Sequence, residues 1–140
     1  MTDLKKAIMD HLVQDVFCRL GASPLHGVGV FAIRPIKKGV NPLRSRTEFE
    51  EVQFTHDEIK TLPRGIRKQI EMFCYYDESG VLISTMGMNT MDFAIYLNHS
   101  KQPNLRMTKE GRFEALRSIK IGEELTMDYD HSFGDEHHFD

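Results

Sequence analysis

Asn98-His99-Ser100-Lys101-Gln102-Pro103-Asn104 follows directly on an apolar run, Phe93-Ala94-Ile95-Tyr96-Leu97. This junction needs an explanation, because short polar side chains rarely enter a protein interior without hydrogen-bonding partners. The segment is therefore either a densely hydrogen-bonded turn or part of a pocket that holds a polar ligand.

Length and charge limit the class of protein. The chain has 140 residues, of which 40% are apolar, and this is enough for a single domain with its own core. The formal net charge is −3, which argues against direct nucleic-acid binding because that function needs a basic surface. An acidic surface would suit a basic protein partner.

The cysteines and the apolar segments indicate where the protein works. Cys18 and Cys74 form no C-x-x-C pair, so we expect reduced, buried thiols rather than a disulfide framework or a cysteine zinc site. The sequence contains no signal peptide and no apolar span of about 20 residues. We expect a soluble intracellular protein, cytoplasmic or, in a eukaryote, nuclear, that makes no membrane contact.

Hydrophobic patterning predicts a mostly β domain with a short helical insert. A capping box at Thr55 and Glu58, followed by Pro63, predicts two short helices. Strand patterns flank the turn Lys109-Glu110-Gly111 and predict a hairpin. We expect one domain, 1–140. Its parts are an N-terminal helix (1–13), a core (20–130) that contains the helical insert (about 41–80), and a C-terminal tail (131–140).

A glycine pair marks the start of a β-like run. Gly27 and Gly29 flank Val28 within His26-Gly27-Val28-Gly29-Val30-Phe31-Ala32. One reading is a tight turn, because glycine reaches positive φ without steric cost. The other is that missing side chains let a ligand approach the backbone, whose amides and carbonyls would bind it. Gly-x-Gly alone leaves both open.

A third stretch lies near the C-terminus, where Gly122-Glu123-Glu124-Leu125-Thr126-Met127-Asp128-Tyr129 reads as an acidic turn and a strand over 125–129. Taken in chain order, the stretches 26–32, 98–104 and 122–129 resemble the motifs of the SET-domain family of protein-lysine methyltransferases. The resemblance covers about residues 20–130. It implies a β-clip fold of several small sheets, in which the C-terminal segment passes beneath an earlier loop as a pseudoknot. Composition could not predict this, because threaded chains are rare.

The resemblance implies S-adenosyl-L-methionine as cofactor. The residues implied to bind it are Gly27, Val28, Gly29, Asn98, His99 and Tyr129. Asn98 suits this role because its side chain carries both a donor and an acceptor. The alternative is that Asn98 and His99 only satisfy buried loops. We expect no metal at His99, since no second ligand lies at a typical spacing.

The implied reaction is methyl transfer to a lysine side chain of a histone or another basic protein. Lysine has a reference pKa of about 10.4, and an apolar, aromatic channel would disfavour its charged form. Tyr129 is the implied catalytic residue, with Tyr96 as the second candidate, because a neutral phenol can align an amine without adding charge. Packing on the core is the alternative role for both. The residues expected to line the substrate channel are Phe93, Tyr96, Phe133 and Phe139.

Departures from the family leave further alternatives open. Lys101 stands where many relatives carry a cysteine, and no cysteine-rich tail follows, so the zinc cluster of those relatives is not expected. The tail or a second subunit could close the channel instead, and a homodimer through the N-terminal helix or the C-terminal strand is compatible with this. The main alternative function is a non-catalytic protein-binding module with the same fold. A third reading is a metal site in the tail, formed by His131, His137, His138 and Asp140.

Overall fold

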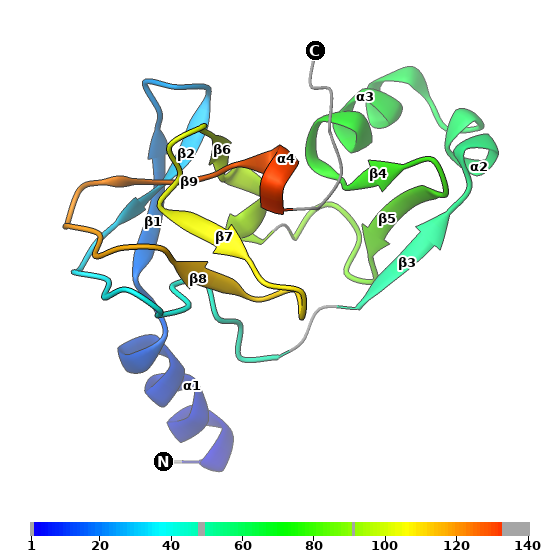
Figure 1. Ribbon diagram of the computed structural model, residues 1–140. Helices are drawn as coiled ribbons and strands as arrows, with labels where there is room; N and C mark the ends of the chain where they lie inside the picture. The colour runs from blue at the N-terminus through cyan, green and yellow to red at the C-terminus, as the bar shows by residue number, and fades with distance from the viewer. Residues whose placement is uncertain (1, 48–49, 91, 133–140) are drawn as a thin grey trace. The chain divides into compact units, whose positions relative to one another are not determined.

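Short strands dominate the computed structural model, which describes residues 2–47, 50–90 and 92–132 (Figure 1). The helices are α1 (Asp3–Gln14), α2 (His56–Lys60), α3 (Arg64–Phe73), the 3-10 helix η1 (Phe93–Tyr96) and α4 (Tyr129–Ser132). The strands are β1 (Cys18–Ala22), β2 (Val28–Ala32), β3 (Glu51–Phe54), β4 (Tyr76–Asp77), β5 (Gly80–Ser84), β6 (Asn98–His99), β7 (Leu105–Met107), β8 (Phe113–Ala115) and β9 (Glu124–Met127). This confirms the mostly β prediction. The chain divides into two compact units, Met1–Arg46 with Tyr96–Asp140, and Thr47–Ile95.

The first unit is built on a six-stranded sheet in which the C-terminal strand β9 is central. β9 pairs antiparallel with β2 and parallel with both β6 and β7, while the predicted β7–β8 hairpin forms the far edge. The C-terminal segment is thus inserted between strands that precede it in the chain. This is the arrangement of several small pairings that the β-clip prediction requires, and it brings the three sequence motifs onto adjacent strands.

The core of this unit lies along β9 and its neighbours. Val30, Leu105 and Leu125 are fully buried, and Leu97 is almost so. Burying such side chains is the main favourable term in folding. Cys18 is also buried, and burial raises the pKa of its thiol to about 12. Cys74 is only half-buried, so the prediction of two buried thiols holds for Cys18 alone, and both cysteines are free.

Helix α1 is anchored at both ends. The Thr2 hydroxyl accepts a hydrogen bond from the backbone N–H of Lys5 at the helix start. At the helix end, the Arg34 guanidinium donates to the carbonyl oxygens of Val13 and Gln14 at 2.6 and 2.9 Å. A cation there complements the negative end of the helix dipole. None of the helices in the described part of the chain is long and apolar enough to cross a membrane.

The second unit contains the two predicted helices and a sheet that patterning did not indicate. Both hydrogen bonds of the predicted capping box are present, between Thr55 and Glu58. Strands β3, β5 and β4 pair in that order, and Ile59, Ile70 and Val81 form the buried cluster between helices and sheet. The insert therefore is not purely helical, because helices this short need a sheet surface against which to bury their apolar faces.

Candidate active site

Asn98 joins all three sequence motifs. Its side chain is only 8% exposed on β6. The amide nitrogen Nδ2 donates to the carbonyl oxygen of His26 at 3.0 Å, to that of Val28 at 3.4 Å, and to the Glu124 carboxylate at 2.8 Å. No described residue donates to the other side-chain atom, Oδ1. Asn98 therefore satisfies buried loops with its donor and keeps an acceptor for a further partner.

The glycine pair serves two different purposes. Gly27 has φ of +48°, and nothing lies within 4 Å of the place where a Cβ would stand, so it supplies the turn between β1 and β2. At Gly29, a Cβ would collide with the Glu124 carboxylate and lie 3.0 Å from the Cβ of Ser23. The group that approaches the Gly29 backbone is thus the Glu124 side chain of the same protein, and not a ligand. The turn at Gly27 is where open space remains.

Glu124 is a residue of this cluster that the sequence interpretation missed. Its carboxylate accepts from the Ser23 hydroxyl at 2.8 Å as well as from Asn98. Its neighbour Glu123 pairs instead with exposed Arg117 at 3.0 Å. The signal was present in the alternation of a strand, which sends successive side chains to opposite faces. The second of two adjacent glutamates starts β9 and faces inward.

Asn104 is a densely hydrogen-bonded turn residue. It is 2% exposed, its Nδ2 donates to the Glu124 carbonyl at 2.9 Å, and its Oδ1 accepts from the Thr126 backbone N–H at 2.8 Å. Both ends of its amide are therefore used within the protein. The sequence left two interpretations of the 98–104 motif open, a densely hydrogen-bonded turn and a pocket for a polar ligand. Asn104 matches the first, and Asn98, which keeps an acceptor, is compatible with the second.

Tyr129 lies against the motif, but not at the end of a strand as predicted. β9 ends at Met127, and Tyr129 begins α4, because the Asp128 side chain accepts from the backbone N–H of Asp130 at 3.1 Å and turns the chain. The Tyr129 hydroxyl donates to the carbonyl oxygen of Leu97. Its backbone N–H donates to His99 Nδ1 at 3.1 Å, and the two rings are 5.2 Å apart. Burial raises the pKa of the phenol, which keeps it neutral.

The remaining predicted site residues fall in different places. Tyr96 is half-buried at the end of η1, next to Leu97. Phe93 is 37% exposed and belongs to the unit Thr47–Ile95. Phe133 and Phe139 lie outside the described residues, as do His137, His138 and Asp140 of the tail. The aromatic channel therefore stays a prediction.

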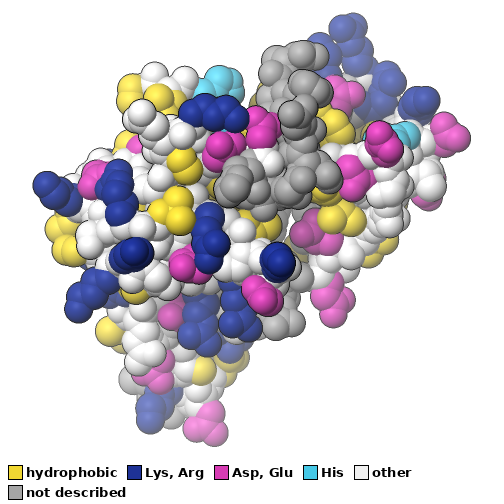
Figure 2. Space-filling view, viewed as in Figure 1, with side chains coloured by type: hydrophobic (Ala, Val, Ile, Leu, Met, Phe, Trp, Pro, Cys, Tyr) yellow, Lys and Arg dark blue, Asp and Glu magenta, His cyan; other side chains and the backbone are white. Residues whose placement is uncertain are grey.

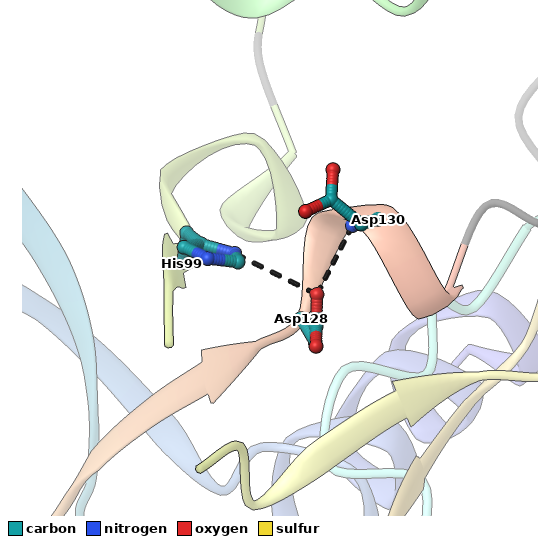
Figure 3. Close-up of side chains that lie close together, drawn as sticks. All are labelled: His99, Asp128 and Asp130. Carbon is teal, nitrogen blue, oxygen red and sulfur yellow. Dashed lines mark hydrogen bonds and ion pairs between the residues drawn. The ribbon is translucent and has the colours of Figure 1, made fainter. Parts of the chain in front are cut away.

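Three ionisable side chains, of His99, Asp128 and Asp130, lie close together (Figure 3). Ligand atoms of His99, Asp128 and Asp130 all lie within 4.8 Å of one another, a spacing that could suit a metal ion. However, the Lys101 ammonium lies 2.8 Å from Asp130 Oδ2 and 3.4 Å from Asp128 Oδ1. A cation of the protein itself thus already balances these carboxylates.

Comparisons with known proteins show the family and the fold. Residues 27–130 match the sequence model of the SET domain. The fold is similar to that of a candidate histone methyltransferase of Plasmodium falciparum, with a TM-score of 0.50 and 21% identity over 86% of this chain and 98% of that one. It is also similar to a humanized mutant of the Chaetomium thermophilum Polycomb Repressive Complex 2 bound to the inhibitor GSK126. There the TM-score is 0.53 and the identity 23%, over 93% of this chain but only 18% of the other. No curated protein matches this chain.

Proposed function

The chain belongs to the SET-domain family, and from that premise we propose that it is an S-adenosylmethionine-dependent methyltransferase acting on a lysine side chain of a protein. One observation supports this more than any other. Two hydrogen bonds hold Tyr129 against residues 97–99. Its hydroxyl donates to the Leu97 carbonyl, and its backbone N–H donates to His99 Nδ1. A neutral phenol is thereby placed beside the polar motif that we assign to the cofactor.

The residues around Asn98 fit the amino-acid end of the cofactor. The carbonyl oxygens of His26 and Val28 lie at the Asn98 amide nitrogen, Asn98 Oδ1 accepts from no described residue, and an ammonium group needs acceptors of this kind. Gly27 leaves space at the tip of the turn. We assign Asn98, His99 and the turn 26–29 to this binding site. S-adenosylmethionine, when bound, supplies a methyl group on a positively charged sulfur.

Tyr129 would act on the lysine amine. At pH 7 a lysine of reference pKa about 10.4 must lose a proton before its lone pair can react, at a cost of about 4–5 kcal/mol unless the site shifts that pKa. A neutral phenol oxygen can accept a hydrogen bond from the amine while its own proton is donated to Leu97. Because burial raises the pKa of Tyr129, no phenolate forms there near neutral pH to stabilise the ammonium form. Correct positioning then contributes most of the rate.

We propose a basic protein as the substrate, with a histone as one candidate. The net charge of −3 favours a basic partner. Charged side chains of both signs are spread over the face drawn in Figure 2. The Plasmodium falciparum neighbour is described as a candidate histone methyltransferase, which supports the same class of substrate.

The direct test is methyl transfer from labelled S-adenosylmethionine to proteins of a cell extract, with the modified residue identified by mass spectrometry. We expect label on lysine, and a loss of about 100-fold in rate for Tyr129→Phe without loss of cofactor binding. Tyr76→Phe, at an exposed tyrosine of the other unit, is the matched control. Cofactor binding without any transfer by the wild-type protein would favour the non-catalytic binding module instead.

A further inference from the structure

Lys101 touches the carboxylates on both sides of Tyr129. Its side chain is 67% exposed, on the loop that follows β6. The ammonium lies 2.8 Å from Asp130 Oδ2 and 3.4 Å from Asp128 Oδ1. Asp128 and Asp130 are the sequence neighbours of Tyr129. A single side chain from the 98–104 motif therefore contacts the residue before Tyr129 and the residue after it.

The turn that carries Tyr129 depends on side chains for its shape. Helix α4 has only four residues, too few to be stable by its own backbone hydrogen bonds. Two of its backbone N–H groups are bonded by side chains, that of Tyr129 by His99 Nδ1 at 3.1 Å and that of Asp130 by Asp128 Oδ1 at 3.1 Å. Figure 3 shows Asp128 between His99 and Asp130. Any displacement of Asp128 therefore changes the backbone at the phenol.

Lys101 also removes a repulsion within this turn. The nearest ligand atoms of Asp128 and Asp130 lie within 4.8 Å of each other, and two carboxylates at that distance repel. The two carboxylates in turn raise the pKa of the Lys101 ammonium, chiefly through the hydrogen bond to Asp130. Without the ammonium, the repulsion would push Asp130 away from Asp128 and open the first turn of α4.

We propose that Lys101 is a positioning residue for Tyr129, which acts by holding the carboxylates of Asp128 and Asp130 around the turn that presents the phenol. Its effect on the reaction rests on the methyltransferase function proposed above. Its effect on the turn does not. The two can therefore be measured separately.

The first measurement needs no activity. Amide exchange at Tyr129 and Asp130, followed by NMR, reports directly on the two N–H groups of the turn. We expect Lys101→Ala to exchange about threefold to tenfold faster at both amides, in line with the loss of exposed ion pairs. Lys101→Arg, which can still bridge two carboxylates, should exchange like wild type. Lys109→Ala removes an exposed lysine of the β7–β8 turn that has no carboxylate partner in the described part of the chain, and should change neither amide.

The second measurement is steady-state methyl transfer. Lys101→Ala should lower kcat about threefold to tenfold and leave the KM for S-adenosylmethionine within about twofold, whereas Lys101→Arg restores kcat. Adding Asp130→Asn to Lys101→Ala should restore part of the lost kcat, because it removes the carboxylate repulsion that the ammonium no longer balances. Unchanged amide exchange in Lys101→Ala would overturn the proposal whether or not the wild-type enzyme is active. Altered exchange with an inactive wild-type protein would remove only the catalytic function. Altered exchange with an undiminished kcat would show that the turn does not position the phenol.

Discussion

Single side chains in this protein connect segments that are far apart in the sequence. Asn98 reaches the turn at 26–28 and Glu124, and Lys101 reaches Asp128 and Asp130. The sequence motifs were enough to predict that Asn98, His99 and the 26–29 turn lie together, and the structure brings Asn98 to this turn. Glu124 was missed because the strand was taken to begin at Leu125, so the alternation that turns the second glutamate inward was not applied to it.

At this scale we predict that Glu124→Gln is destabilising. A glutamine would place an NH2 group or a weaker acceptor against the Asn98 amide, which leaves a partly buried donor unsatisfied at a cost of about 1–3 kcal/mol. Thermal unfolding measures the change. Glu123→Gln, which removes an exposed ion pair with Arg117, should cost less than about 1 kcal/mol. Equal melting temperatures for the two variants would show that Glu124 is not a structural acceptor.

At the scale of elements, β9 orders the first unit. Its pairing with β2 on one side and with β6 and β7 on the other brings Tyr129 to the Asn98 loop. Strand patterns predicted β7, β8 and most of β9 but not the short β6, since a parallel pairing between β6 and β9 leaves no local signal in either. The end of β9 was misplaced by two residues, because the Asp128 side-chain turn overrides the strand propensity of Tyr129.

Two glycine-to-alanine substitutions, one in β2 and one in α3, test the contact between β2 and β9. Gly29→Ala would drive a Cβ into the Glu124 carboxylate, and we expect a loss of about 1–3 kcal/mol in the free energy of unfolding. Gly65→Ala, in α3 with nothing within 4 Å of the new Cβ, should be neutral or gain up to about 1 kcal/mol. Chemical denaturation of both variants gives the comparison. A Gly29→Ala protein as stable as Gly65→Ala would contradict the close approach.

For the whole molecule, the alkaline limit of stability follows from two buried acids. Burial raises the pKa of the Cys18 thiol from 9.0 to about 12 and that of the Tyr129 phenol above 10.0. Both groups hold their proton more tightly when folded, so their contribution is complete below pH 9 and is lost as pH rises through the folded pKa values. We expect the urea midpoint to fall between about pH 9 and 12, and to fall less steeply in Cys18→Ala. Identical pH profiles would contradict burial of that thiol.

The family fold could be predicted from three motifs in the right order, whereas within residues 47–95 only the two helices could be predicted from sequence. Helix signals in that segment were strong, because capping boxes are local. Its sheet was not predicted, because β3 and β5 pair across 25 intervening residues and so distant a pairing leaves no local signal in either strand. The aromatic channel likewise depends on volumes that no local pattern encodes.

Titration calorimetry with S-adenosylmethionine tests the central claim most directly. If Asn98, His99 and the 26–29 turn form a cofactor site beside Tyr129, the wild-type protein should give a saturable heat with one site per chain. Asn98→Ala, with its folded state verified by thermal unfolding, should bind at least tenfold more weakly, as expected for the loss of a hydrogen bond to a charged group. A wild-type protein that gives neither heat nor a shift in melting temperature at saturating ligand would contradict the account.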